Sequence, residues 1–218
     1  MVRGIDVNKM RLPRLSRRWP IVGTAYTAML IGAYCWWILQ SPHERLAVLT
    51  SSSTDLDHLQ RVPWLVLPAS SLWSGDHVGY WVIVVLLCVG ALEVVRGPVV
   101  TLLTGLTAHV IGTLVSEGIL AIRIAAGELS SSARHLQDVG PSYIVAACAA
   151  AVIASPRSHR WLRLACGLCL VPLVVTAFDF SDASQVAAIG HAVSMLIGAS
   201  VGRSRIARRQ GLRIAEAA

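Results

Sequence analysis

Six stretches of apolar residues, most of them near the length of a membrane-spanning helix, constrain this sequence more than any other feature. They cover residues 20–39, 77–92, 99–122, 140–154, 162–178 and 186–201. A bilayer core about 30 Å thick requires about 20 apolar residues per helix. Hydrophobic residues make up 55% of the chain and charged residues only 14%, which is too apolar for one water-soluble core. We therefore predict an all-α, polytopic membrane protein with six transmembrane helices.

The basic residues predict how the chain is oriented in the membrane. Fifteen of the 19 Lys and Arg residues precede the first predicted helix, follow the sixth, or lie in the second-to-third and fourth-to-fifth loops. Short cytoplasmic loops retain Lys and Arg. Both termini are therefore expected in the cytoplasm, with residues 1–19 as a basic segment, 20–202 as the membrane domain and 203–218 as a basic tail. The excess of arginine over lysine indicates a GC-rich bacterial genome, so we expect a bacterial plasma membrane.

The net charge of +7 does not make nucleic acid the expected partner. The basic residues are spread along one predicted membrane face, and no nucleic-acid-binding motif accompanies them. Anionic lipid headgroups account for such a charge better. Membrane lipids are therefore the expected partners, and the oligomeric state is left open. The five cysteines all lie in apolar runs, where they are interpreted as small buried hydrophobic residues.

The connection between the first two predicted helices, residues 40–76, is long and partly apolar. It contains an apolar stretch over residues 62–68 and the tryptophans Trp64 and Trp73. Tryptophan is enriched where a membrane meets water. We expect this connection to lie partly in the interface.

Small residues recur at every fourth position of the sixth run, at Gly190, Ser194, Gly198 and Gly202. Such a face allows another helix to approach closely, and the fourth run is rich in alanine. His191 lies next to this face near the outer end of the sixth run, and Ser142 opens the fourth run. Close packing of the two helices is expected to bring the hydroxyl and the imidazole together.

A serine beside a histidine is the minimum arrangement for nucleophilic catalysis. The imidazole takes the hydroxyl proton during attack on a carbonyl and returns it to the leaving amine. The resulting oxyanion requires hydrogen-bond donors, and His77 with the backbone N–H of Ser142 are the candidates. The alternatives are a helix-capping hydroxyl for Ser142, a buried core residue for His191 and an interfacial residue for His77.

Three motifs occur in one order along the chain. His77, Glu93 and Gly97 mark the second run, Gly140, Pro141 and Ser142 open the fourth, and His191, Ser194 and Gly198 lie in the sixth. This order resembles the rhomboid family of intramembrane serine proteases over most of the chain. The resemblance implies a six-helix rhomboid-like bundle that cleaves transmembrane segments of client proteins without a cofactor or metal. It implies Ser142 as nucleophile, His191 as general base, and His77 with the Ser142 N–H as oxyanion donors.

Three positions depart from the pattern of that family. Trp81 stands where an asparagine is typical, Tyr143 replaces the glycine after the nucleophile, and Ala146 replaces an aromatic residue. These departures favour a first alternative, a catalytically inactive rhomboid-like protein that binds membrane clients without cleaving them.

Ionisable side chains at membrane depth are costly and often mark functional sites. His109 and Glu117 lie in the third run, eight residues apart on one helical stripe. Pairing inside the bundle is one interpretation of these two residues. A second alternative function follows from the other interpretation: a small transporter or metal-binding bundle that uses His77, His109, Glu117 and His191.

Overall fold

A computed structural model describes residues 19–175, 178 and 181–204, and the predicted basic terminal segments lie almost wholly outside that range. The described chain is helical and contains no strand. Six helices fall on the six predicted apolar runs: α1 (Ile21–Ile38), α5 (Val78–Arg96), α6 (Pro98–Ala125), α7 (Ser142–Ala154), α8 (Arg160–Val175) and α9 (Asp182–Arg203). The prediction of an all-α membrane bundle is confirmed.

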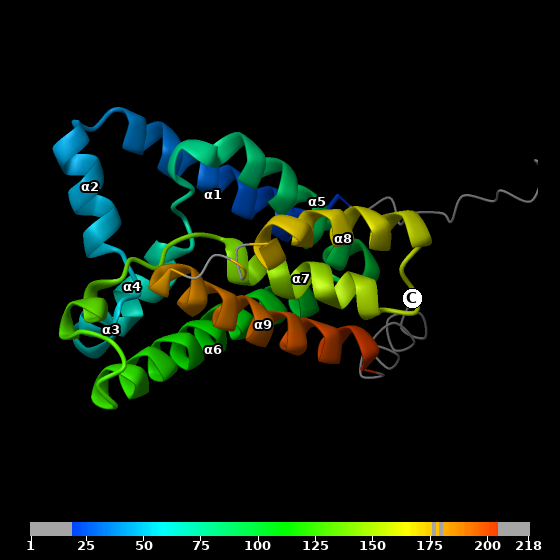
Figure 1. The fold of residues 1–218 in the computed structure, drawn as a ribbon. Helices are drawn as coiled ribbons and strands as arrows, with labels where there is room; N and C mark the ends of the chain where they lie inside the picture. The colour runs from blue at the N-terminus through cyan, green and yellow to red at the C-terminus, as the bar shows by residue number, and fades with distance from the viewer. Residues whose placement is uncertain (1–18, 176–177, 179–180, 205–218) are drawn as a thin grey trace, which may run out of the picture.

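The connection between α1 and α5 is folded into short helices. These are α2 (Pro42–Ser51), α3 (Leu56–Arg61), α4 (Pro63–Ser70) and the 3₁₀ helix η2 (Gly75–His77). Local capping explains where they begin: Ser41 and Glu44 form a capping box ahead of α2, and the Asp55 side chain caps α3. α4 begins at Pro63, a residue favoured in the first turn of a helix. Figure 1 shows α2–α4 gathered at one end of the bundle, which we call the α2–α4 end.

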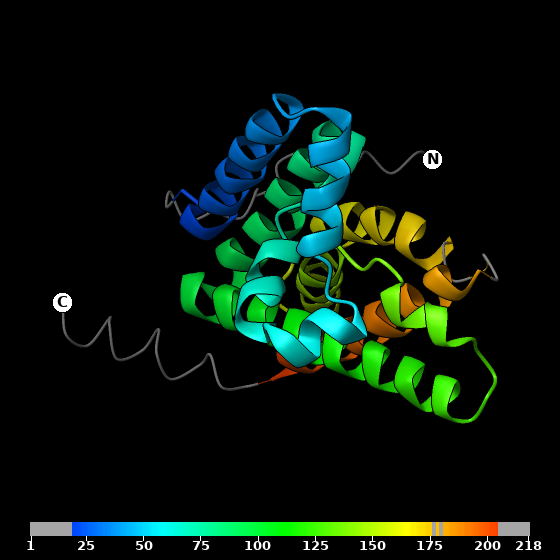
Figure 2. The ribbon, with the colours of Figure 1, turned by 90° about the vertical axis from the view of Figure 1, so that its left-hand side faces the viewer.

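Helix α7 is the centre of the bundle. All ten residues from Tyr143 to Val152 are buried, and the helix contacts α5, α6, α8 and α9. Figure 2 shows it nearly end-on, surrounded by the other helices. At 1.5 Å per residue, its 13 residues span about 20 Å, less than the thickness of a bilayer core. Its first turn, which carries Ser142, therefore starts well inside the ends of α6 and α9 (Figure 1).

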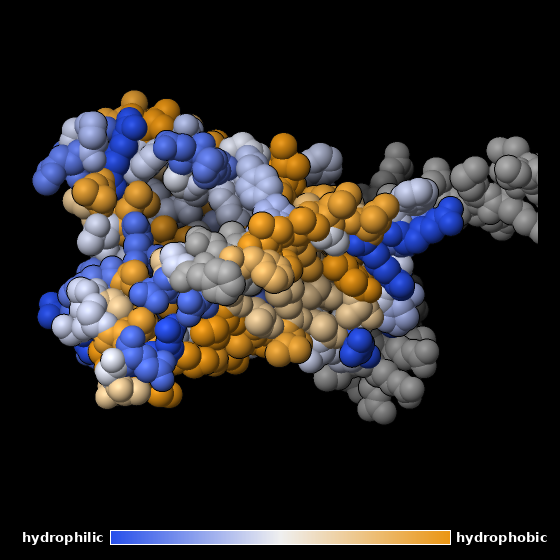
Figure 3. Space-filling model, in the orientation of Figure 1, coloured by the Kyte–Doolittle hydropathy of each residue, from blue (hydrophilic) through white to orange (hydrophobic). Residues whose placement is uncertain are grey.

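The outer surface of the bundle is suited to lipid. Within the part of the chain that the structure describes, four helical segments are long and apolar enough to cross a membrane: Ile21–Ile38, Gly75–Arg96, Pro98–Ala125 and Asp182–Arg203. The other two helices are shorter: α7 has 13 residues and α8 has 16. Figure 3 shows an apolar surface over the middle of the bundle and hydrophilic residues toward both ends. The chain is therefore a multi-pass membrane protein.

Two polar side chains of α5 hold the ends of other helices. Glu93 accepts hydrogen bonds from the backbone N–H groups of Val22 and Gly23, at 2.8 and 3.1 Å. These groups belong to the first turn of α1, which has no acidic residue and no side-chain cap of its own. At the same end of α5, Arg96 donates to the carbonyl oxygens of Gly202 and Ser204, at the end of α9. α5 thus fixes α1 and α9 through buried or half-buried charges.

Candidate functional site

Helices α7 and α9 run in the same direction and touch at backbone distance. A Cβ added at Gly198 would lie 2.7 Å from the carbonyl carbon of Ala147 and against its oxygen. One turn further on, a Cβ at Gly202 would meet the main chain of Ala151. Ser194, one turn before Gly198, instead donates a 3.3 Å hydrogen bond to Ala108 O on α6. α9 therefore packs against α7 through glycines and against α6 through this serine.

Tyr143 occupies the contact between α7 and α9 at the level of His191. Its ring lies 5.3 Å from the imidazole, centroid to centroid, at an interplanar angle of 79°, an edge-to-face arrangement. A Cβ at Gly190 would overlap the Tyr143 ring, which is 2% exposed. On its other side the same ring lies 6.2 Å from His109 of α6. The tyrosine thus fills the space where the three helices meet.

Ser142 and His191 are neighbours of this contact but are not hydrogen-bonded to each other. His191 is 4% exposed, and neither ring nitrogen has a hydrogen-bond partner of normal geometry among the described residues. The backbone of Leu173 on α8 lies beside the ring. Ser142 is half-buried in the first turn of α7. Tyr143, the residue after the serine, is the one that packs on the imidazole.

His77, a predicted oxyanion donor, and two of the positions that depart from the family pattern, Trp81 and Ala146, have the following surroundings. His77 is exposed at the end of η2, directly before α5. Trp81 packs against the main hydrophobic core and makes an edge-to-face contact with Tyr80, at 5.1 Å between centroids. Ala146 is fully buried in that core. An aromatic ring on the imidazole is nevertheless present, supplied by Tyr143 and not by position 146.

His109 and Glu117 do not pair with each other. His109 Nε2 lies 2.7 Å from Leu67 O and 3.2 Å from Ser70 Oγ, so α6 is joined to α4. Glu117 is 1% exposed, and neither carboxylate oxygen has a hydrogen-bond partner among the described residues. Within the same part of the chain, no three His, Cys, Asp or Glu side chains are grouped to hold a metal ion. The four residues of the transporter hypothesis thus do not assemble into one centre.

Asp138, in the loop before α7, connects the tyrosine to the α2–α4 end. Its Oδ2 accepts hydrogen bonds from Tyr143 Oη at 3.2 Å and Thr54 Oγ1 at 3.3 Å. Its backbone carbonyl accepts from Thr54 N at 3.0 Å, and its backbone N–H donates to Ser53 Oγ at 3.0 Å. Burial raises the pKa of Asp138 to about 6, although both side-chain hydrogen bonds favour the carboxylate. Glu117 also lies close enough to interact electrostatically with Asp138.

The raised pKa of Asp138 predicts a pH-dependent stability. The folded state binds the proton more tightly than the unfolded chain, whose aspartates have a pKa of about 3.9. This contribution is fully present below about pH 4 and is lost as the pH rises through about 6. We expect thermal unfolding in detergent to show wild type losing more stability than Asp138→Asn between these pH values. Parallel pH profiles for the two proteins would contradict this assignment.

The sequence motifs did not identify Tyr143, Asp138 or Thr54 as parts of the site. In the sequence, Tyr143 is only a departure from the glycine of the family pattern, and Thr54 lies 84 residues before its partner Asp138. A signal was available in the run Asp138 to Tyr143, where an acid and a phenol flank the glycine and proline that precede Ser142. The pairing itself depends on the loop geometry.

A comparison against known protein families finds one family whose model matches most of this chain. Residues 20–209 match the family described as rhomboid-like protein, a range that covers the whole helical bundle. No curated protein and no solved structure matches the chain significantly. The matched range includes Ser142, Tyr143 and His191, and it exceeds half of the sequence by a wide margin. The chain therefore belongs to the rhomboid-like protein family.

Proposed function

We propose that this rhomboid-like membrane protein binds transmembrane segments of other proteins without hydrolysing them. One observation carries the proposal: the imidazole of His191 is covered by Tyr143 and has no hydrogen bond to Ser142. A general base must come within hydrogen-bond reach of the hydroxyl that it activates. In this structure the buried ring of Tyr143 packs against the imidazole where the serine hydroxyl would have to lie. Trp81, packed into the core, supplies no small amide near the serine.

A client helix is proposed to bind beside α8, a helix in which only Cys166 and Leu173 are buried. α8 packs mainly on α7 and has few contacts with α5 and α9. It exposes a row of large apolar side chains, among them Trp161, Leu164, Leu168 and Val171. Pro172 interrupts its hydrogen-bond ladder near the end of the helix. A helix held on one side and weakened at one end offers less resistance to an incoming segment than the central helices do.

The proposed placement is the plasma membrane of a bacterium, with both termini in the cytoplasm. The distribution of Lys and Arg supports this orientation, because fifteen of the 19 fall on the same side of a six-helix map. On this placement, the α2–α4 end of the bundle and the first turn of α7 lie toward the outer leaflet.

A second candidate function is intramembrane serine proteolysis. It is favoured by the backbone contact of α7 and α9, which holds Ser142 one residue away from the side chain that touches His191. Catalytic hydrogen bonds in free enzymes are often long and tighten only when substrate is bound. In this case Ser142 is the nucleophile, His191 the general base, and His77 with the Ser142 N–H the oxyanion donors.

Labelling with a fluorophosphonate probe separates the two candidates. The probe reacts with an activated serine hydroxyl, so the proposal predicts equal labelling of detergent-solubilised wild type and Ser142→Ala. A known serine hydrolase in the same detergent controls for probe reactivity. Strong labelling of wild type that is lost in Ser142→Ala would overturn the non-cleaving function and establish the protease.

Client binding is tested with a photocrosslinking amino acid at Leu168 of α8, against a matched control at Leu106 of α6. Both side chains are exposed, at 64% and 52%, and each lies eight residues after the start of its helix. In liposomes that contain a purified single-span peptide, we expect crosslinking from position 168 to exceed that from position 106 severalfold. Equal yields would indicate random collision in the bilayer and contradict binding beside α8.

A further inference from the structure

The end of the bundle opposite α2–α4 carries arginine side chains from three helices and one turn. α5 ends at Arg96 and α9 at Arg203, while Arg157 lies in the turn between α7 and α8 and Arg160 opens α8. Arg96 donates a 3.0 Å hydrogen bond to Ser204 O, just after α9, and lies close enough to Arg157 for the two charges to interact. These contacts bring the arginines together at one end of the bundle.

Arg157 and Arg160 are exposed, and no acidic side chain balances their charge. Neither guanidinium forms an ion pair or a hydrogen bond within the part of the chain that the structure describes. Glu93, the acid nearest to Arg96 along the sequence, accepts instead from the first turn of α1. The neighbour of Arg157 is thus a second cation, Arg96, and not a carboxylate. Like charges that lie close together without an acid favour a bound anion.

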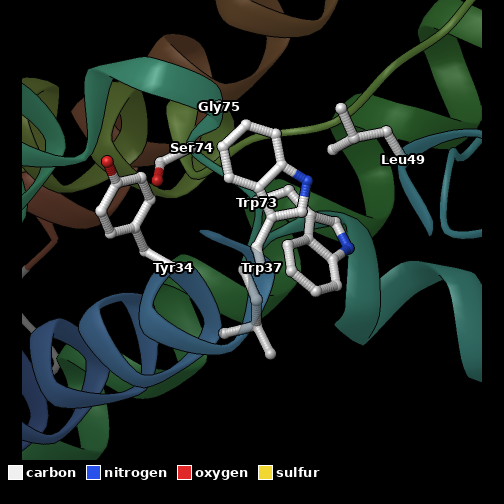
Figure 4. A pocket seen from close by; sticks show the side chains of 7 residues that line it. Tyr34, Trp37, Leu49, Trp73, Ser74 and Gly75 are labelled. Atoms are coloured by element: carbon white, nitrogen blue, oxygen red, sulfur yellow. The ribbon is translucent and has the colours of Figure 1, made fainter. Parts of the chain in front are cut away.

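Arginines at the α2–α4 end, by contrast, are engaged with the protein. Arg134 donates to Asp57 Oδ1 through two nitrogens, at 3.0 and 2.8 Å. Arg45 donates to the Gln40 carbonyl at 3.0 Å, and its guanidinium lies 5.0 Å from the centroid of the Trp37 ring. Figure 4 shows Trp37 among the other aromatic side chains there, and the space that they line is too narrow for a water molecule. The unbalanced and accessible charge therefore lies at the end where α8 begins.

An exposed apolar surface continues from Arg160 along α8. Trp161 and Leu164 are 62% and 53% exposed, and their spacing of three residues places them on one face of the helix. The Arg160 guanidinium lies 5.2 Å from the centroid of the Trp161 ring. Tryptophan is enriched where a membrane meets water, and arginine there extends its charge toward the headgroups. The surface therefore matches a molecule with an anionic group next to an apolar chain, whereas a soluble anion would match only the arginines.

We propose that Arg157 and Arg160 bind the headgroup of an anionic phospholipid whose acyl chains begin along Trp161 and Leu164. The two guanidinium groups donate to the phosphate oxygens, and hydrogen bonds between guanidinium and phosphate are among the strong ones in proteins. Arg96 is held by the end of α9 and contributes positive potential without contacting the lipid. The inference is independent of whether Ser142 is catalytic and of client binding further along α8.

Native mass spectrometry of the full-length protein, released from detergent after lipid titration, tests the proposal. The ligands are phosphatidylglycerol, the zwitterionic phosphatidylcholine with the same acyl chains, and inorganic phosphate. We expect phosphatidylglycerol to bind about tenfold more tightly than phosphatidylcholine, because only the first carries a net negative charge. Equal binding of the two lipids would overturn the role of that charge. Displacement of phosphatidylglycerol by inorganic phosphate at the same concentration would identify a free anion as the ligand and overturn the lipid.

Substitutions locate the bound lipid at the start of α8. Arg157→Gln with Arg160→Gln removes both charges, and we expect phosphatidylglycerol affinity to fall about tenfold or more. Both side chains are exposed and unpaired, so the melting temperature should stay close to that of wild type. The matched control Arg61→Gln removes an exposed arginine of α3 at the opposite end and should bind like wild type. Wild-type affinity in the double variant, or an equal loss in Arg61→Gln, would overturn the site.

A conservative pair of substitutions separates charge from side-chain shape. Arg157→Lys with Arg160→Lys keeps both positive charges but loses the planar guanidinium donors. We expect its phosphatidylglycerol affinity to lie between those of wild type and the glutamine double variant. A lysine variant that binds as weakly as the glutamine variant would overturn charge as the basis of the recognition.

Discussion

Replacing Gly198 with alanine is expected to lower the stability of the protein by about 3 kcal/mol or more, a decrease in melting temperature of about 10 °C. The added methyl group would lie against the carbonyl oxygen of Ala147, and 2.7 and 2.8 Å from its carbonyl carbon and Cα. These atoms are backbone in the centre of a fully buried helix, so they cannot turn aside as a flexible side chain would. The alanine fits only if α7 and α9 separate.

Thermal unfolding of the purified protein in a mild detergent measures this effect. Gly167→Ala is the matched control, because Gly167 also lies inside a long helix, α8, and a Cβ added there meets nothing within 4 Å. Alanine is the better helix former, so we expect the control to be neutral or slightly stabilising. A melting temperature of Gly198→Ala equal to that of the control would mean that α7 and α9 are further apart than described here.

Replacing Glu93 with alanine is expected to cost about 3 kcal/mol, because two backbone N–H groups then lose a charged acceptor. Both groups belong to the first turn of α1, where the helix dipole adds to the attraction for a negative charge. Gly23 also lies against the backbone of α5, since a Cβ added there would be 2.9 Å from Gly90 N. The loss is therefore expected to loosen α1 from α5.

Two further substitutions serve as controls for the loss of stability expected in Glu93→Ala. Glu93→Gln keeps an acceptor oxygen and should retain part of the stability, so its melting temperature is expected between those of wild type and Glu93→Ala. Glu128→Ala removes an exposed acid that pairs with Arg123 near the surface, and a change within about 0.5 kcal/mol is expected. If Glu93→Ala and Glu128→Ala unfold at the same temperature, the contact of Glu93 with α1 contributes no more than a surface ion pair.

The connection between α1 and α5 contains short helices that apolar periodicity does not predict. Residues 40–76 were expected to lie partly in the interface, and no helix was predicted there. α2, α3 and α4 have ten, six and eight residues, too few turns for an apolar stripe to repeat. Their starts are nonetheless marked in the sequence by Ser41 with Glu44, by Asp55 and by Pro63. In these short helices the capping residues, and not an apolar periodicity, indicate where each helix begins.

The sequence by itself determined the membrane bundle and its close helix pair. Runs of about 20 apolar residues have few stable alternatives to a membrane-spanning helix, because an unpaired backbone group in lipid costs several kcal/mol. The small residues Gly190, Gly198 and Gly202 indicated a face of α9 that another helix could approach closely, and the alanine-rich α7 meets it. Both inferences depend on local composition, which a single sequence displays directly.

Only the tertiary structure decided which side chain of α7 faces His191. Successive residues of a helix point about 100° apart, so Ser142 and Tyr143 compete for that direction. An amphipathic helix orients its polar face by contrast with its apolar one, but α7 is buried on every side from Tyr143 to Val152. Its rotation is set instead by the fit of the Tyr143 ring over Gly190 and by the hydrogen bond from its hydroxyl to Asp138. These are contacts between distant parts of the chain, and spacing along the sequence does not encode them.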